Sequence, residues 1–146
     1  MRGHKQGLEI CECLLLADME SAYKVMSQLR TNITVTEYLE RVKLATSAGY
    51  RLFCARDKDT IVGVIGFRVQ HDLCWGTNLY VDDLVVDEYH RRQGIGTALM
   101  QHAENSAKEI NCDFVRLASG INKQEAHRFY EAIGYKKTSY AFALKL

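Results

Sequence analysis

The sequence contains no proline in its 146 residues. A proline-rich linker therefore cannot divide the chain, and no internal repeat or compositionally biased segment is visible. Because domains most often hold about 100–150 residues, we expect one domain spanning residues 1–146. With 47% hydrophobic and 25% charged residues, the composition is that of a globular protein and not of a disordered chain.

Strong net charge is also missing, because 19 Lys and Arg residues against 18 Asp and Glu residues leave only +1. Without a basic field, neither nucleic acid nor an anionic membrane is an expected partner. The apolar runs are too short to span a bilayer. The opening residues, MRGHKQG, lack the apolar stretch of a signal peptide. We therefore expect a protein that is not exported.

Metal-binding cysteine patterns are absent as well. The five cysteines form no CxxC pair and no zinc-finger spacing with the five histidines. Their odd number and mostly apolar neighbours predict buried free thiols in the reducing cytoplasm. No metal site is expected.

Hydrophobic periodicity predicts the order β-α-α-β-β-β-α-β-α-β. The expected strands cover residues 8–16, 50–56, 60–70, 79–86, 114–118 and 135–146. The expected helices cover residues 19–29 after an Asp18 cap, the span from a Thr34 capping box to Gly49, residues 95–110, and residues 122–133. Gly63 and Gly66 interrupt a strand and mark a bulge or the close approach of another segment. The pattern predicts a mixed α/β fold with helices against one largely continuous sheet.

The most informative segment is residues 91–99, Arg-Arg-Gln-Gly-Ile-Gly-Thr-Ala-Leu, which joins a predicted strand to a predicted helix. Free N–H groups and a partial positive charge let a helix N-terminus hold an anion. Glycines allow a phosphate to approach the backbone, and Arg91 and Arg92 add charged donors. The segment lacks the third glycine of a dinucleotide fold and the Gly-Lys of a P-loop. It predicts a pyrophosphate site, and a turn with solvated arginines is the alternative.

Two motifs carry a family resemblance. Arg91-x-x-Gly94-x-Gly96 resembles the acyl-CoA pyrophosphate loop of the GNAT superfamily of N-acetyltransferases. Residues 122–135, Asn-x-x-x-Ala-x-x-Phe-Tyr-Glu-x-x-Gly-Tyr, are similar to that family's second signature and follow in the expected order. The close resemblance covers residues 79–135, and the rest of the chain agrees in element order.

The resemblance implies one mixed, mostly antiparallel twisted sheet with flanking helices, splayed between strands 4 and 5, here residues 79–86 and 114–118. Acetyl-CoA would lie in that gap as the co-substrate. The resemblance implies three sets of contacts with it. The pantetheine would lie along the backbone of Leu84, Val85 and Val86, and the pyrophosphate would be bound by Arg91, Arg92, Gln93, Gly94, Ile95, Gly96 and Thr97. The pantetheine and thioester would also lie near Asn122, Ala126 and Tyr130.

Acetyl transfer to an amine requires a neutral nitrogen, although a free alkylamine has a pKa of about 10.4. A carboxylate can remove the proton. Asp82 and Asp83 are adjacent on a strand, so we expect them to face opposite sides of the sheet. Asp82 resembles the family's glutamate and is the preferred base, with Asp83 in reserve. Alternatively, either carboxylate is only structural, or the amine arrives neutral and needs no base.

The departing thiolate benefits from a proton, which a tyrosine hydroxyl can donate. Tyr130 resembles the family's general acid, although a core aromatic is the alternative at its position. A strand N–H near Leu84 and Val85, freed by the splay, would stabilise the oxyanion. Asn122 also fits a helix N-cap reciprocated by Glu125.

The amine acceptor is the least determined part. The resemblance places its pocket among the first two helices and residues 71–78. Candidate pocket residues are Trp75, Tyr80, Tyr23 and Tyr38 as walls and Asp72 and Asp82 as attractors of a cationic amine. A small amine is expected, and a peptide or protein acceptor is the alternative. A non-catalytic acyl-CoA-binding module and a purely structural protein stay open, and the resemblance suggests a homodimer covering the C-terminal strand.

Overall fold

The computed structural model describes residues 7–146. Residues 1–6, which hold most of the segment predicted to lack a signal sequence, lie outside the described part. The chain divides into two compact units, of which the first ends at Arg116 and the second comprises Leu117–Leu146. Each unit is described by itself below.

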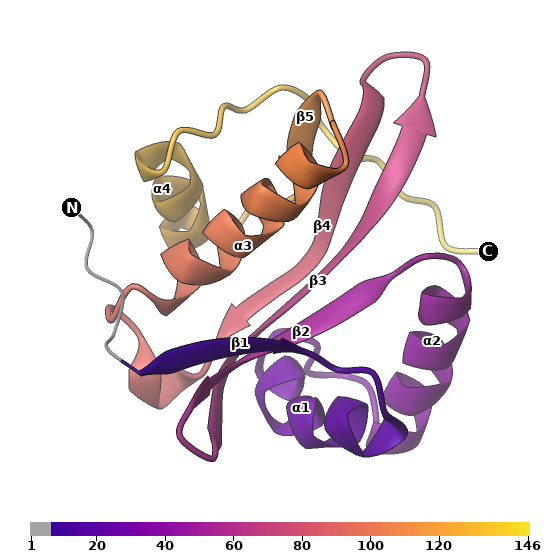
Figure 1. Cartoon of the computed structure of the whole chain (residues 1–146). Helices are drawn as coiled ribbons and strands as arrows, with labels where there is room; N and C mark the ends of the chain where they lie inside the picture. The colour runs from indigo at the N-terminus through magenta and orange to yellow at the C-terminus, as the bar shows by residue number, and fades with distance from the viewer. Residues whose placement is uncertain (1–6) are drawn as a thin grey trace. The chain divides into compact units, whose positions relative to one another are not determined.

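One five-stranded sheet organises the first unit (Figure 1). Its strands are β1 (Leu8–Glu12), β2 (Arg51–Asp57), β3 (Thr60–Asp72), β4 (Gly76–Val86) and β5 (Phe114–Leu117), in that spatial order. The first four strands pair antiparallel, and β5 runs parallel to β4. The predicted mixed, mostly antiparallel sheet is therefore confirmed.

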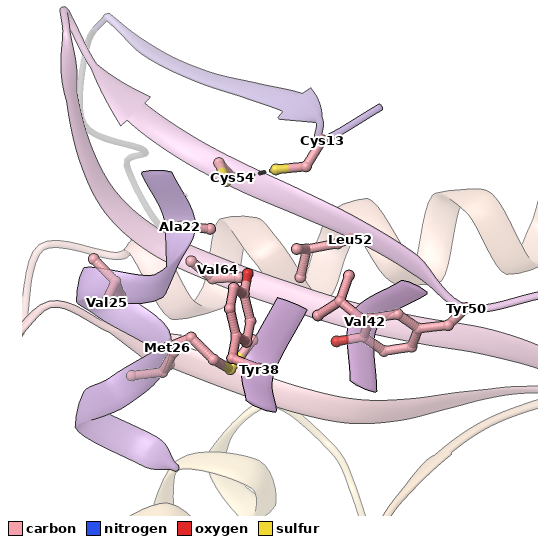
Figure 2. Close-up of a cluster of buried hydrophobic side chains, with 11 residues drawn as sticks. Cys13, Ala22, Val25, Met26, Tyr38, Val42, Tyr50, Leu52, Cys54 and Val64 are labelled. Atoms are coloured by element: carbon pink, nitrogen blue, oxygen red, sulfur yellow. Dashed lines mark hydrogen bonds between the residues drawn. The ribbon is translucent and has the colours of Figure 1, made fainter. Parts of the chain in front are cut away.

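Helices cover both faces of this sheet. The helices of the first unit are α1 (Leu16–Leu29), α2 (Val35–Ser47) and α3 (Ile95–Glu109), and a short 3-10 turn, η1 (Glu88–His90), follows β4. Val64 of β3 belongs to the apolar cluster beneath α1 and α2, which Figure 2 shows. A Cβ on the preceding Gly63 would press on Ile95 and Leu99 of α3, at 2.9 Å from each. Since neighbouring strand residues face opposite sides, α3 lies across the sheet from α1 and α2.

The first two helices begin differently from one another. Thr34 caps α2 as predicted, because its Oγ1 accepts a hydrogen bond from the Glu37 N–H at 3.2 Å. The strand predicted through residue 16 ends at Glu12. The reason is that the Asp18 carboxylate accepts from the Leu15 N–H at 3.3 Å, which makes Leu15 the N-cap and starts α1 earlier. Asp18 is thus the third helical residue and not the cap.

The second unit holds one helix, α4 (Gln124–Ala132). Lys123 is its N-cap, so the predicted role of Asn122 as the cap is wrong, and the helix is shorter than expected. The strand predicted over residues 135–146 is also wrong, since these residues form no regular secondary structure. An alternating pattern becomes a strand only when a neighbour bonds its backbone, and the second unit provides no such neighbour.

Candidate active site

A β-bulge lies where the sequence places its two candidate carboxylates. In the β3–β4 ladder Gly66 pairs with Asp83 and Phe67 pairs with Val81, so Asp82 is an extra residue on β4. Such a bulge interrupts the alternation of side chains and re-aims them. The two neighbouring aspartates therefore need not face opposite sides.

Asp83 is held by two donors. Its Oδ2 accepts from the Tyr50 hydroxyl at 2.7 Å, and its Oδ1 accepts from Nε of Arg30 at 2.9 Å. Tyr50 belongs to the apolar cluster beneath α1 and α2. Gly66 is required here, because a Cβ at this position would overlap the Tyr50 hydroxyl. Asp83 is thus fixed on the α1–α2 face.

Asp82 lies on the same face. Nε of Arg68 donates to both of its oxygens, at 3.2 and 3.0 Å. Arg68 and Val64 are four residues apart on β3, so they share the face that α1 and α2 cover. The prediction that the two aspartates face opposite sides of the sheet is wrong, because it assumed regular pleating through the bulge.

Burial raises the pKa of the Asp82 carboxyl above its ordinary value, and the hydrogen bond and charge of Arg68 oppose that shift. The nearby charge of Asp83 raises it further. The Asp82 side chain keeps 26% of its surface exposed, whereas that of Asp83 keeps 16%. Asp82 is therefore the more accessible of the two carboxylates.

Two of the four aromatic residues expected in an acceptor pocket are structural. The Tyr23 hydroxyl donates to the Ile33 carbonyl at 2.7 Å, and the Tyr38 hydroxyl donates to the Met19 carbonyl at 2.6 Å. Burial raises the pKa of Tyr38, which lies inside the cluster of Figure 2. Both tyrosines hold α1 to the chain around it.

Trp75 and Tyr80 instead form cation–π contacts with arginine side chains. Arg68 lies 5.2 Å from the centre of the Tyr80 ring. Arg116 of β5 lies 4.6 Å from the centre of the Trp75 ring and 5.5 Å from that of Tyr80. Sequence reasoning missed both arginines, although a charged residue inside an apolar strand was a usable signal.

Asp72 is committed to the turn between β3 and β4. Its Oδ1 accepts from the Trp75 N–H at 2.6 Å, and its Oδ2 accepts from the fully buried Asn78 at 2.8 Å. The Trp75 N–H is also the largest reason that the pKa of Asp72 lies below its ordinary value. These bonds shape the turn and occupy both carboxylate oxygens.

The N-terminus of α3 is uncapped. Its N-cap is Gly94, in the left-handed region with φ 77°, and no side chain of the described residues caps the first turn. Arg92 also has a positive φ of 62°, which turns the chain sharply before the helix. Arg91, Arg92 and Gln93 are exposed. Free backbone donors, two glycines and two arginines thus lie together, as the sequence predicted.

A half-buried amide anchors the segment that leads into this turn. Nε2 of Gln28 on α1 donates to Oδ1 of Asp87 at 2.7 Å, and Oε1 of Gln28 accepts from the Glu88 N–H at 2.9 Å. Oδ2 of Asp87 meets Nδ1 of His90 at 2.6 Å. The bond from Gln28 is the largest reason that the pKa of Asp87 is lowered. Sequence analysis gave no sign of this link between α1 and the loop.

The end of β4 extends past β5. The Asp113 N–H donates to the Thr77 carbonyl at 2.7 Å, which brings the start of β5 beside the start of β4. β5 has four residues, whereas β4 has 11, and parallel strands advance equally per residue. The part of β4 that holds Leu84, Val85 and Val86 therefore reaches beyond the partner strand.

In the second unit, Tyr130 packs among aromatic rings of its own unit. Its ring centre lies 5.2 Å from that of Phe129 and 6.2 Å from that of Tyr135. Burial raises the pKa of Tyr130 to about 12. Ala126 is half-buried on the same helix, and Asn122 is exposed before it.

Residues 16–135 match the Acetyltransferase (GNAT) family. The chain belongs to this family. It is accordingly an acetyl-CoA-dependent N-acetyltransferase, and the predicted resemblance is confirmed.

Two relatives match this acetyltransferase over most of their length. It is 32% identical over 123 residues to an uncharacterized N-acetyltransferase, YhdJ, of Bacillus subtilis, covering 83% of this chain and 87% of the relative. It is 28% identical to an aminoalkylphosphonate N-acetyltransferase of Salmonella typhimurium, covering 100% of this chain and 98% of the relative.

The solved structures agree on the fold. An aminoglycoside N-acetyltransferase AAC(6')-Iy in complex with CoA superposes with a TM-score of 0.83 at 13% identity, covering 99% of this chain and 97% of that chain. An aminoglycoside acetyltransferase from an uncultured soil sample, in complex with sisomicin, gives a TM-score of 0.82 at 20% identity, with coverages of 96% and 97%.

Within residues 7–146 no group of three or more His, Cys, Asp and Glu side chains is placed to hold a metal ion. None of the helices formed there is both long and apolar enough to cross a bilayer.

Proposed function

We propose that this acetyltransferase moves the acetyl group of acetyl-CoA to the primary amine of a small acceptor by direct attack. The observation that carries the proposal is the uncapped N-terminus of α3 behind two exposed arginines, in a chain of the GNAT family. The family match runs across both compact units, which supports one catalytic domain over the whole chain.

The residues that would hold acetyl-CoA fit its chemistry. A pyrophosphate suits the free N–H groups of the segment from Gly94 to Thr97, with charged bonds from Arg91 and Arg92 and a polar contact from Gln93. The overhanging backbone of Leu84–Val86 can pair with the pantetheine amides as an added strand would. Asn122, Ala126 and Tyr130 of the second unit complete the proposed set through the family's second signature.

Asp82 is the proposed general base. The acceptor nitrogen attacks the thioester carbonyl carbon, the C–N bond forms, and Asp82 takes a proton from the nitrogen. A raised pKa makes this carboxylate a better base than an ordinary aspartate. Asp83 is the less exposed of the two carboxylates and bonds to both Tyr50 and Arg30, so we assign it to positioning.

The tetrahedral intermediate then collapses. A backbone N–H near Leu84 and Val85 holds the oxyanion, the C–S bond breaks, and the Tyr130 hydroxyl gives its proton to the departing sulfur. A pKa of about 12 keeps this hydroxyl protonated across the working pH range, as a proton donor requires. The proton on Asp82 returns to solvent, and Tyr130 is reprotonated from it.

The relatives support a small acceptor over a peptide. The aminoalkylphosphonate enzyme matches end to end, and an aminoglycoside N(6')-acetyltransferase of Acinetobacter baumannii covers 86% of this chain and 80% of its own length. By contrast, N-alpha-acetyltransferase 30 of Xenopus laevis matches only 43% of this chain and 23% of its own length. A peptide acceptor is therefore the second candidate.

A thermal-shift titration with acetyl-CoA, free CoA and NAD tests the cofactor assignment. A ligand at a hundredfold excess over Kd stabilises the fold by about 2.7 kcal/mol. We expect a shift with the first two and none with NAD, followed by CoA release in a thiol assay with an amine panel. No shift with acetyl-CoA would overturn the loop assignment.

A Tyr130→Phe variant separates an enzyme from a non-catalytic acyl-CoA-binding module. We expect it to bind acetyl-CoA as the wild type does while its rate of CoA release falls. An unchanged rate would remove Tyr130 from the chemistry, and no amine-dependent CoA release by the wild type would favour the binding module.

We also propose a cytoplasmic location. All five cysteines are free, and the sulfurs of Cys13 and Cys54 lie 2.8 Å apart. Thiols this close persist unlinked in a reducing compartment. Alkylation of the isolated protein in denaturant, without reductant, should label all five cysteines, and a Cys13–Cys54 disulfide would contradict the assignment.

A homodimer is the proposed assembly. The C-terminal segment carries four apolar side chains that are 85% or more exposed, namely Tyr140, Phe142, Leu144 and Leu146. Such a segment suits pairing with a second copy. Light scattering should report twice the chain mass, and a monomer mass at working concentration would refute the dimer.

A further inference from the structure

Within the part of the chain that the structure describes, no carboxylate forms an ion pair with Arg116. Among those residues it forms one long hydrogen bond, 3.4 Å from Nη1 to Oδ1 of Asn78, and no ion pair. Its guanidinium lies against the rings of Trp75 and Tyr80. Its charge contributes to the lowered pKa of Asp72, but both oxygens of Asp72 are already bonded to the turn. A partly buried arginine that lies over aromatic rings is a ready site for an anion.

This cation adjoins the proposed base. Arg68 and Arg116 contact the same Tyr80 ring, and Arg68 also pairs with Asp82 at 3.0 Å. Tyr80 and Arg68 are direct partners in the β3–β4 ladder. The three charged groups therefore lie around Tyr80 on one face of the sheet.

The charge balance decides what kind of acceptor fits. A simple alkylammonium that approached Asp82 would separate Asp82 from Arg68 and leave two unpaired guanidinium groups beside its own charge. A polycation would be repelled still more. An acceptor with both an amine and an anionic group keeps every charge paired, because its ammonium group pairs with Asp82 while its anion pairs with the two arginines.

We propose that the acceptor is a small amine bearing an anionic group, carboxylate or phosphonate, and that Arg116 on the rings of Tyr80 and Trp75 binds that group while Arg68 shares it. This rests on the proposed function. It also gives Arg68 a second role, since transfer of its bond from Asp82 to the acceptor's anion frees the base only when a matching acceptor is bound.

The geometry of the arginines favours this role over simple packing. The Nε–H of Arg68 is used by Asp82, and its side chain remains 41% exposed. After the amide of Gln70 is oriented to satisfy its neighbours, the Gln70 oxygen accepts from Nη1 and Nη2 of Arg68. Gln70 can release those groups with little loss, because it is a neutral acceptor and an anion binds a guanidinium more strongly.

The test compares amine acceptors that carry an anionic group with amine acceptors that lack one. With acetyl-CoA saturating, kcat/KM is measured for 2-aminoethylphosphonate, β-alanine, propylamine, 1,5-diaminopentane and kanamycin. We expect at least about a tenfold preference for the first two over the last three, as one charge-assisted bond implies. The phosphonate and carboxylate arms decide which anion is preferred. Equal or better turnover of propylamine or the polycations overturns the inference while the acetyltransferase proposal stands.

Variants assign the effect to the residue. Arg116→Gln should lose about tenfold or more on the anionic acceptors and change little on propylamine, while Arg116→Lys should restore part of the loss. Arg56→Gln on β2 is the control that removes the same charge elsewhere on the sheet. A loss by Arg116→Gln that is equal for every acceptor would show a structural role and overturn the inference.

A binding measurement tests the contact between Arg116 and the acceptor's anion independently of turnover. In the presence of CoA, 2-aminoethylphosphonate should raise the melting temperature of the wild type and of Arg56→Gln but not of Arg116→Gln. If no amine is acetylated, the proposed function fails, and this binding difference still tests the anion subsite. A stabilisation that Arg116→Gln retains would overturn the subsite.

Discussion

The hydroxyl of Tyr50 donates a 2.7 Å hydrogen bond to the carboxylate of Asp83, and Gly66 leaves the space through which it passes. The bond joins the residue that precedes β2 to β4 across β3, directly beside the bulge that displaces Asp82. Burial, together with the negative charge of Asp83, raises the pKa of Tyr50 well above its ordinary value, so the hydroxyl stays a donor. The position of the proposed base, Asp82, thus depends on the Tyr50–Asp83 hydrogen bond, which crosses β3.

Tyr50→Phe should lower the free energy of unfolding by about 1.5–3 kcal/mol, because a charged acceptor loses its buried donor. Urea denaturation measures this. Gly66→Ala should destabilise by about 1–3 kcal/mol for a different reason, the overlap of its Cβ with the Tyr50 ring and hydroxyl. In the double variant the hydroxyl is gone and part of the overlap with it, so the combined loss should be smaller than the sum of the two single losses. Full additivity would mean that the two sites do not touch.

Asp82→Asn should lower kcat by about 10²–10⁴, as expected for loss of a general base. The wild-type rate should fall as the pH drops through the pKa of Asp82, because the protonated carboxyl cannot accept a proton. Burial raises that pKa, so the fall occurs above the ordinary aspartate range. A pH profile of kcat measures it, and Asp83→Asn is the comparison. An Asp82→Asn enzyme with the wild-type profile would exclude Asp82 as the base.

Gly94→Ala should raise KM for acetyl-CoA. Its φ of 77° disfavours any Cβ by about 1–2 kcal/mol, and the methyl group would occupy the space that a phosphate needs. Arg91→Gln should also raise KM, and its effect should shrink in high salt because the arginine is exposed. Gly49→Ala is the control, since Gly49 has a φ of 102° with nothing near its Cβ and follows the C-cap of α2, away from the loop. It should lose stability but keep the wild-type KM.

Gln28→Ala should loosen the loop before α3 and raise KM for acetyl-CoA while leaving kcat at saturation nearly unchanged. Ser27→Ala is the neighbouring control, because Ser27 bonds only to its own helix. The Gln28 variant should also lower the free energy of unfolding by about 1–3 kcal/mol. A change in kcat with an unchanged KM would place Gln28 in the chemistry and not in the loop.

The stability effect of Gln28→Ala should depend on pH with a defined sign. The bond from Gln28 lowers the folded-state pKa of Asp87, so this stabilisation is complete above the unfolded-state value of about 3.9. It is lost as the pH falls through the folded-state pKa, where Asp87 takes up a proton. The gap between wild type and variant in urea titrations should therefore narrow at acidic pH, and a gap that widened would contradict the assignment.

Local signals in the sequence determined much of the framework. Thr34 caps its helix and Gly94 begins α3, because both effects depend only on neighbouring backbone groups. The segment that joins β4 to α3 was predicted for the same reason. The sequence also predicted that Gly63 or Gly66 marks a bulge or a close approach, and the structure shows the bulge beside Gly66 and the close approach of α3 at Gly63. The two family motifs then identified the acetyltransferase.

Tertiary structure decided the rest. Only the β3–β4 register shows that Asp82 is displaced onto the face of Asp83, and only packing distinguishes Tyr38 in the core from Tyr80 beneath two arginines. The contact between Gln28 and Asp87 joins residues 59 positions apart, and no periodic pattern in the sequence predicts it. A sequence pattern reflects interactions between residues that are close along the chain. Pairing across strands depends instead on the register, which the whole fold determines.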